Sequence, residues 1–390
     1  MILKVRGASL KEIVKNLRYT SLHYVTHGLR HPVLSVSHKS NFHPFAVYNP
    51  VDQGKNIWYS FKSVFLLTRL SKNTEKHYYL QIISMAALIG RDLLGLADLS
   101  STELQELLEM ATQLKSQQLK FHSNKVLGLL FSKASTRTRV SFTVAMYQLG
   151  GQVIDLNPNV TQVSRGEPVQ DTARVLDRYL DILAIRTFAQ QELEIFANYA
   201  KIPVINALTD LEHPCQVLAD LQTIQEYFGT LAGLTLAYVG DGNNVANSLM
   251  LGCALAGMNV QVAFPSGYAP DAEIVEKARA VANNKTEVVL THDPKAAAEG
   301  AHILYTDVWA SMGQEAEADN RLPIFQPYQI SEQLLGLADP QAIVLHCLPA
   351  HRGEEITEEV IEGSQSKVWD QAENRLHAQK ALLASILGAE

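Results

Sequence analysis

Short apolar runs alternate with longer amphipathic stretches through most of this chain. Four of these runs come first, at residues 125–131, 152–156, 182–186 and 203–207. The segments between them are long enough for the helices that must connect parallel strands, whose two covered faces make them apolar throughout. The pattern therefore predicts one α/β domain built on four parallel strands.

A second series of apolar runs begins at Gly233. Its members span residues 233–239, 259–264, 287–290, 303–306 and 342–345, again with helix-sized spacings. The predicted fold class is α/β, with two doubly wound parallel-sheet domains. We expect the active site in the cleft between them, because ligands bind beyond the carboxyl ends of parallel strands. The first domain should cover residues 85–219 and the second residues 220–371.

Helical patterns mark the ends and the junction of these domains. Ser100 and Glu103 have capping-box spacing ahead of apolar residues at helical period. Further helices are predicted at 139–149 and at 220–228, the latter bridging the two domains. A C-terminal helix at 372–387 has a single apolar stripe and must pack against a partner, which we expect to be the first domain.

Composition narrows the class of protein. The 390 residues are 47% hydrophobic and 19% charged, enough for two domains with real cores, and the sequence has no run of about 18 apolar residues that could cross a membrane. The three cysteines, Cys215, Cys253 and Cys347, lie far apart. This spacing excludes a disulfide framework and a zinc knuckle and favours a reducing compartment.

Charge divides the chain at Met85. Residues 1–84 hold 12 Lys and Arg against 3 Asp and Glu, so they carry +9, and the remaining 306 residues carry −16. An acidic body lacks the basic face that nonspecific nucleic-acid binding needs, so we expect small-molecule ligands. The basic segment shows no sustained period and is predicted to lie outside the fold, as the product of a mis-set start codon, an organellar transit peptide or a docking extension.

The strongest candidate for chemistry is the polar segment that follows the first strand. It contains Ser135, Thr136, Arg137 and Thr138 at the opening of a helix. Unpaired N–H groups and the helix dipole attract anions there, so phosphate is the expected guest. Ordinary N-capping by Ser135 or Thr136 would explain one hydroxyl but not the alternating arginines.

Other strand ends in the first domain carry further candidates. Arg186 ends the third strand, and His213 and Gln216 follow the fourth. They add one cation and two neutral hydrogen-bonding groups, which suits a carbonyl attached to the phosphate. Gln162 and Arg165 follow the second strand and are weaker candidates, because loops are polar in any case.

The second domain opens with a glycine-rich turn that invites a dinucleotide-binding interpretation. In Gly240-Asp241-Gly242-Asn243-Asn244-Val245, however, valine stands where the motif needs its last glycine, and no acid ends the next strand. An NAD-dependent oxidoreductase is therefore a remote alternative. The amides of Asn243 and Asn244 suit a carboxylate instead.

Two further clusters follow the last strands of the second domain. Asp307 can pair with an ammonium group, and Ser311 with Met312 offers a hydroxyl and a backbone N–H. Cys347 enters the same crevice beside His346. No cluster in the sequence has metal-ligand spacing.

Five segments in this order resemble the aspartate/ornithine carbamoyltransferase family, and within it the ornithine-specific branch. They are Ser135–Arg139, His213–Gln216, Asp307–Gly313, His346–Pro349 and Glu373–Arg375. Each segment alone is weak, whereas all five in order are specific, and the likeness covers nearly all of residues 85–390. Cys347 and the Ser311-Met312-Gly313 run separate the ornithine branch from the aspartate branch.

The resemblance implies transfer of the carbamoyl group of carbamoyl phosphate to the side-chain amine of L-ornithine, giving L-citrulline and phosphate, as in arginine biosynthesis or the urea cycle. On carbamoyl phosphate it places Ser135, Thr136, Arg137, Thr138, Gln162, Arg186, His213, Gln216, Cys347, Leu348 and Arg375. On ornithine it places Asn244, Asp307, Ser311 and Met312. The catalytic residues among these would be Arg137, His213, Asp307, Cys347 and Arg375.

The same resemblance implies a homotrimer or a multiple of trimers, with no cofactor, no metal, no nucleic acid and no membrane partner. A cytoplasmic enzyme is expected, or an organellar one if residues 1–84 are a transit peptide. Two alternatives remain: a related carbamoyltransferase that uses putrescine or an acylated ornithine, and a catalytically silent binding scaffold. A silent relative would be expected to lack one of the five segments.

Overall fold

The computed structural model describes residues 88–119, 121–157, 166–310 and 317–388, together with four short strands nearer the N-terminus. The chain divides into two units, Met1–Ser84 and Met85–Glu390. The first unit has two antiparallel pairs: β1 (Ser21–Val25) with β2 (Val33–Ser37), and β3 (Phe45–Val47) with β4 (Ile57–Tyr59). The sequence pattern predicts none of these strands, of which two are only three residues long.

The first sheet of the second unit is parallel, with strand order β6-β5-β7-β8. Its strands are β5 (Val126–Phe131), β6 (Gln152–Leu156), β7 (Ile182–Arg186) and β8 (Val204–Leu208). The accompanying helices are α4 (Ser101–Lys115), α5 (Thr136–Gln148), α6 (Val169–Leu176) and α7 (Gln190–Tyr199), with a short 3-10 turn η2 at Leu96–Asp98. All four strands predicted from apolar runs are confirmed to within one residue, as is the capping box at Ser100.

The second sheet is also parallel, with strand order β11-β10-β9-β12-β13. Its strands are β9 (Thr235–Val239), β10 (Asn259–Ala263), β11 (Val288–Thr291), β12 (Ile303–Thr306) and β13 (Ile343–His346). The accompanying helices are α9 (Asn244–Ala256), α10 (Ala272–Ala282), α11 (Pro294–Ala298), α12 (Ala318–Phe325), the 3-10 turn η6 (Gln326–Tyr328), α13 (Glu332–Leu335) and α14 (Glu358–Ile361). The five predicted strands agree to within two residues.

Three helices begin earlier than their apolar patterns predict. Helix α5 begins at Thr136 instead of 139, α8 (Pro214–Phe228) at Pro214 instead of 220, and α15 (Val368–Leu387) at Val368 instead of 372. The first turns of α5 and α8 carry predicted site residues, and α8 is buried on all sides from Pro214 to Ile224. A helix without an exposed face shows no amphipathic stripe, so its start cannot be found from periodicity.

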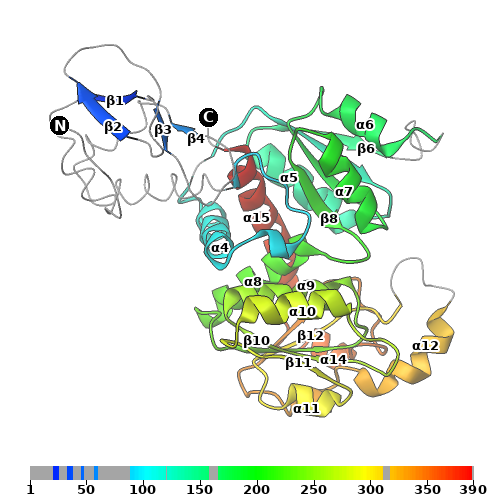
Figure 1. The fold of residues 1–390 in the computed structure, drawn as a ribbon. Coiled ribbons are helices and arrows are strands. Elements are labelled where there is room, and N and C mark those ends of the chain that lie inside the picture. The colour runs from blue at the N-terminus through cyan, green and yellow to red at the C-terminus, as the bar shows by residue number, and fades with distance from the viewer. Residues whose placement is uncertain are drawn as a thin grey trace. The chain divides into compact units, whose positions relative to one another are not determined.

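Two buried helices connect the sheets of the second unit. Helix α15, red in Figure 1, packs against α8, α4 and α5, and α8 packs against α9. Gly252 in α9 makes this last contact close, because a Cβ there would lie 2.4 Å from the Cγ1 atom of Val217. One apolar core therefore extends from Leu129 in β5 through Leu221 in α8 to Leu345 in β13.

No helix within the described ranges is long and apolar enough to span a membrane.

The division at Met85 generates a prediction about the first unit. We expect a chain that starts at Met85 to be soluble, to unfold at the same temperature and to form the same oligomer as the full chain, because every predicted site residue follows Met85. Thermal unfolding, sedimentation and activity measurements check this. Aggregation would show that residues 1–84 belong to the folded protein. So would an activity below about a tenth of the full-length rate, which corresponds to a loss of about 1.4 kcal/mol in transition-state stabilisation.

Candidate functional site

Both sheets have a topological switch point, and several of the predicted site residues lie at these two places. In the first sheet the chain goes from β5 to β6 on one side and then to β7 on the other; Ser135 follows β5 and Arg186 ends β7. In the second sheet the switch lies between β9 and β12, which Asn243 and Asp307 follow. Loops diverge at such a point, which leaves room for a ligand.

Helix capping does not explain the polar side chains of the segment that follows β5. Ser135 occupies the N-cap position of α5, but its hydroxyl makes no capping hydrogen bond. Instead it accepts from Nη1 of Arg186 at 3.4 Å. The hydroxyl thus lies beside a cation at the neighbouring strand end, and because it accepts there its O–H can donate to an anion.

Arg375 on α15 is buried and oriented by neutral partners. Its Nη1 atom donates to Oε1 of Gln216 at 2.6 Å, and its Nη2 atom donates to Oγ1 of Thr138 at 3.0 Å. Its Nε atom has no hydrogen-bond partner among the described residues. Three predicted site residues from α5, α8 and α15 are therefore in direct contact.

Arg137, Arg186 and Arg375 form a positively charged cluster. Burial and the charges of Arg375 and Arg137 lower the pKa of Arg186 to about 10. Burial, opposed in part by nearby acidic groups, also lowers the pKa of Arg375, and Arg137 contributes to that shift. Gathering like charges in a poorly solvated place costs free energy, which a bound anion would offset.

His213 lies beside this cluster and is held neutral by it. Burial and then the charges of Arg375, Arg186 and Arg137 lower the pKa of His213 well below its usual value. Its backbone N–H donates to Oγ of Ser248 at 2.9 Å, while its Nδ1 atom is buried without a hydrogen bond to any described residue. A neutral imidazole can donate from one nitrogen and accept at the other.

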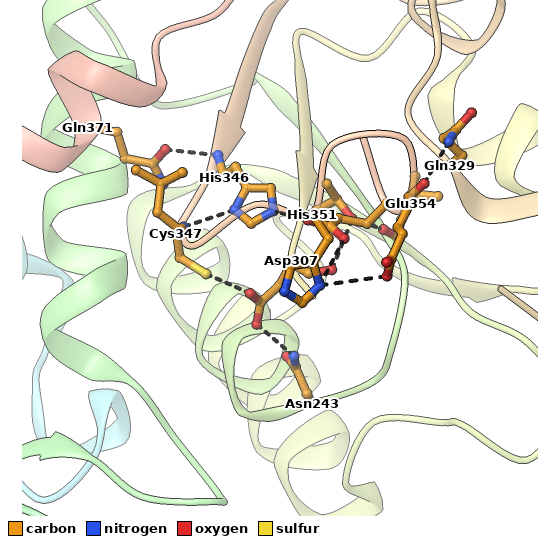
Figure 2. A network of polar contacts seen from close by, with 12 residues as sticks. Asn243, Asp307, Gln329, His346, Cys347, His351, Glu354 and Gln371 are labelled. Carbon is orange, nitrogen blue, oxygen red and sulfur yellow. Dashed lines mark hydrogen bonds and ion pairs between the residues drawn. The ribbon is translucent and has the colours of Figure 1, made fainter. Parts of the chain in front are cut away.

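Asp307 is the centre of the contacts in the second domain (Figure 2). The thiol of Cys347 donates to its Oδ1 atom at 2.8 Å, and Nδ2 of Asn243 donates to its Oδ2 atom at 2.8 Å. Asn243 also caps α9 with its side-chain oxygen. Burial and the charge of Asp307 raise the pKa of Cys347 well above its usual value, so Cys347 is a protonated thiol at neutral pH.

Two hydrogen bonds link the halves of the site. Nη2 of Arg137 donates to the backbone carbonyl of Leu348 at 2.6 Å. Asn244 makes a second link, since its Nδ2 atom donates to the carbonyl of Thr209 at 2.6 Å. The structure thus brings the predicted groups of both domains into one connected set.

Four predicted residues cannot be placed. Gln162, Arg165, Ser311 and Met312 lie outside the described residues.

Several supporting residues were not predicted from the sequence. Asp220 accepts from Nε2 of Gln216 at 2.8 Å and from Nε2 of Gln371 at 2.7 Å, and burial raises its pKa to about 7. Lys133 is buried beside Phe188, with its ammonium 4.1 Å from the ring centre. The only sequence signal for Asp220 is an acid four residues after Gln216, on the same helix face.

The structure also brings together two sets of potential metal ligands that sequence spacing does not reveal. They are Asp307, His346 and Cys347, and His351, Glu354 and Glu355. In the first set, Nδ1 of His346 accepts from the Leu348 N–H and Asp307 accepts the Cys347 thiol. In the second, Oε1 of Glu355 already has two donors. Protein groups occupy these ligand atoms, so we assign no metal to either set.

The fold and the site define an α/β enzyme that brings two small substrates together, one of them anionic. Residues 91–226 match the family described as "Aspartate/ornithine carbamoyltransferase, carbamoyl-P binding domain", and residues 232–386 match "Aspartate/ornithine carbamoyltransferase, Asp/Orn binding domain". The chain belongs to the aspartate/ornithine carbamoyltransferase family and is a transferase. The resemblance seen in the sequence is confirmed.

Individual relatives agree with this assignment. An ornithine carbamoyltransferase from Nostoc punctiforme is 86% identical over 306 residues, which is 78% of this chain and 100% of that protein. The crystal structure of ornithine carbamoyltransferase from Gloeobacter violaceus is 61% identical with a TM-score of 0.71, and the match covers 77% of this chain and 99% of that chain. The enzyme from Pyrococcus furiosus is 50% identical with a TM-score of 0.74, covering 77% and 98%. The predicted fold class is confirmed.

Glu212, next to His213, connects the site to the buried core through hydrogen bonds. Its Oε2 atom accepts from the backbone N–H of Leu96 and from Oγ of Ser248, each at 3.1 Å. Gly95 makes room for this carboxyl, because a Cβ there would lie 2.3 Å from Oε1. Burial raises the pKa of Glu212 to about 7.

This shift predicts a pH dependence of stability. Between pH 4.5, the ordinary pKa of Glu, and pH 7, the unfolded state loses this proton while the folded state keeps it, so the free energy of unfolding falls as pH rises. Glu212→Gln lacks this titrating group, so its free energy of unfolding should fall less steeply with rising pH than that of the wild type. Denaturant unfolding at several pH values checks it. Glu194→Gln, on the exposed face of α7, should keep the wild-type slope, and an unchanged slope in Glu212→Gln would contradict the assignment.

Proposed function

We propose that this chain transfers the carbamoyl group of carbamoyl phosphate to the side-chain amine of L-ornithine and releases L-citrulline and phosphate. The observation that carries the proposal is the cluster of Arg137, Arg186 and Arg375 beside a neutral His213, with Asp307 and Cys347 connected to it through Leu348. A cationic half suits an acyl phosphate, and an anionic half suits an amine substrate. The relatives named ornithine carbamoyltransferase support the choice of ornithine.

In this proposal the first domain holds the phosphate. Ser135, Thr136, Arg137, Thr138 and Arg186 would bind its oxygens at the start of α5, where helix N–H groups add to the positive potential. His213, Gln216 and Arg375 would face the carbamoyl group, with Gln162, Cys347 and Leu348 nearby. Arg375 has N–H groups left for this purpose, since its bonds to Gln216 and Thr138 use only two of its five N–H donors and its Nε atom has no partner among the described residues.

The transfer itself needs charge stabilisation more than covalent catalysis. The neutral amine of ornithine attacks the carbonyl carbon, a C–N bond forms, the C–O bond to phosphate breaks, and one proton leaves the amine. Negative charge grows on the carbonyl oxygen, where Arg137, His213 and Arg375 supply donors that are already in position. The leaving phosphate departs as an anion that the same arginines stabilise.

The second domain would bind ornithine. Asp307 would orient the amine and accept its proton, and Asn244, Ser311 and Met312 would hold the rest of the molecule. Cys347 acts here as a hydrogen-bonding thiol and not as a nucleophile, because its pKa lies well above its usual value. Holding both substrates in one orientation contributes a further rate enhancement.

The wider setting is proposed from the family resemblance. The enzyme would act in arginine biosynthesis, in the cytoplasm, as a homotrimer, without a cofactor. The domain limits would be 85–219 for carbamoyl phosphate and 220–371 for ornithine, with α15 belonging to the first domain, against whose helices α4 and α5 it packs.

A citrulline assay tests the function directly. The enzyme is supplied with carbamoyl phosphate and, separately, with ornithine, putrescine, acetylornithine and aspartate. Carbamoylation of ornithine is the expected result. Turnover only with one of the other amines would assign the chain to a different branch, and no turnover with any would favour a silent scaffold.

Replacing Arg137 should remove activity. We expect Arg137→Ala to bind a phosphonate analogue of carbamoyl phosphate about 2–5 kcal/mol more weakly and to lose measurable turnover, because a buried anion would lose a charged partner. Calorimetry measures the affinity, and the unfolding temperature shows whether the fold is intact. Arg279→Ala, an exposed arginine on α10 paired with Glu276, is the matched control and should behave as wild type. Unchanged analogue binding in Arg137→Ala would remove this residue from the site.

Replacing Asp307 should affect one substrate selectively. We expect Asp307→Asn to impair the use of ornithine strongly while the KM for carbamoyl phosphate stays within about twofold, since Asp307 serves only the amine. Steady-state kinetics with each substrate varied in turn separates the two. An equal loss for both substrates would indicate that Asp307 has a structural role instead.

A further inference from the structure

The turn that follows β13 has an unusual backbone at Leu348. Its φ angle is 58°, in the left-handed region that residues with a side chain rarely adopt. Such a conformation persists only where surrounding contacts fix it. Both polar groups of Leu348 are held: the carbonyl accepts from Arg137 at 2.6 Å, and the N–H donates to Nδ1 of His346 at 2.8 Å.

The second of these bonds determines the protonation of His346. A backbone N–H can only donate, so Nδ1 must accept and carries no proton. The ring proton therefore lies on Nε2. In a ring protonated at Nδ1, the Nδ1–H would face the N–H of Leu348, and the hydrogen bond that holds the turn would be lost.

Glu355 selects this tautomer. Its Oε1 atom lies 3.0 Å from Nε2 of His346 and also accepts the backbone N–H of His351 at 2.6 Å. Both His346 and Glu355 are buried, so water does not substitute for either partner. A carboxylate beside a histidine fixes which nitrogen is protonated and how the ring is oriented.

We propose that Glu355 is a positioning residue for the transfer reaction. It holds His346 as the Nε2–H tautomer, and the free Nδ1 atom of His346 then fixes the N–H of Leu348. This places the Leu348 carbonyl against Arg137. It also places the neighbouring Cys347 thiol against Asp307 (Figure 2). Glu355 itself does not reach the reacting atoms. The inference rests on the proposed carbamoyl transfer.

The backbone at His346 has its own anchor, which separates positioning from general stability. The N–H of His346 donates to Oε1 of Gln371 at 2.9 Å (Figure 2), independently of the ring. Loss of Glu355 therefore leaves the end of β13 in place and frees the imidazole of His346 and the backbone N–H of His351. The expected effect is on the rate and on the tautomer, with a smaller effect on folding.

The test compares Glu355→Gln with Glu355→Leu. A glutamine oxygen can still accept from Nε2–H of His346 and from the His351 N–H, whereas leucine fills a similar volume without an acceptor. We expect Glu355→Gln to keep near-wild-type kcat and Glu355→Leu to lose at least about tenfold in kcat, with a smaller change in the KM for carbamoyl phosphate. Glu354→Leu, the adjacent and half-exposed carboxylate, is the matched control and should keep its rate.

Nitrogen NMR of the imidazoles gives a readout that needs no substrate. The His346 signals are assigned by their loss in His346→Gln. The wild type, Glu355→Gln and Glu354→Leu should show the Nε2–H tautomer at His346, and Glu355→Leu should show a mixture or the Nδ1–H form. If the wild type forms no citrulline, the proposed function fails, while this measurement still decides whether Glu355 controls the tautomer.

Two results would overturn the proposal. One is a Glu355→Leu enzyme that keeps the Nε2–H tautomer or a rate within about twofold of wild type. The other is an equal loss in Glu355→Gln and Glu355→Leu. If Glu355→Leu does not fold, the comparison of His346→Asn with His346→Gln tests the proposal instead. The side-chain oxygen of asparagine can replace Nδ1 as acceptor for the N–H of Leu348, whereas that of glutamine cannot. The proposal then requires His346→Asn to be the more active of the two.

Discussion

Mutual repulsion among Arg137, Arg186 and Arg375 is the constraint on which the rest of this structure depends. The hydrogen-bond acceptors that orient Arg137 and Arg375 are neutral: the Leu348 carbonyl, the Gln216 amide and the Thr138 hydroxyl. A carboxylate in any of these places would be a stronger partner, but it would also cancel the charge. Neutral acceptors hold the guanidinium groups in position and leave their charge available to an anionic substrate.

Two helices make this arrangement possible by carrying polar groups inside the protein. Helix α8 presents Gln216 and Asp220 from its buried faces, and α15 presents Gln371 and Arg375 to meet them. Asp220 accepts two amide N–H groups through one oxygen, which orients the Gln216 amide so that its oxygen faces Arg375. Burying polar groups of this kind costs free energy, which these hydrogen bonds offset. The network explains why these helices have almost no exposed side.

The sequence predicts the strands well because each strand is set by a local property, a short apolar run with a polar cluster at its end. It also predicts the cationic half of the site, since strand ends at a switch point converge in any parallel sheet. It does not predict the partners. Arg375 meets Thr138 and Arg137 meets Leu348 across more than two hundred residues of chain, and nothing local encodes those contacts.

Some side chains make a second contact that the sequence does not indicate. The amide of Asn243, expected to suit a carboxylate, donates to the carboxylate of Asp307, and its side-chain oxygen also caps α9. Glu355 stands in an acidic, polar stretch typical of a solvated turn, but it is completely buried against His346. Asn243 uses two atoms for two contacts, and Glu355 uses one oxygen for two donors; in both cases only the structure reveals the second contact.

The close contact of α8 with α9 at Gly252 has a consequence for how the two sheets share their stability. One apolar core runs from Leu129 to Leu345, so the two sheets share a large part of their buried surface, although each sheet also has a smaller apolar cluster of its own on its other face. The unit should therefore melt as a single cooperative block. A cavity created in the shared core would therefore weaken both halves, and the two domains are separate in their chemistry but coupled in their folding.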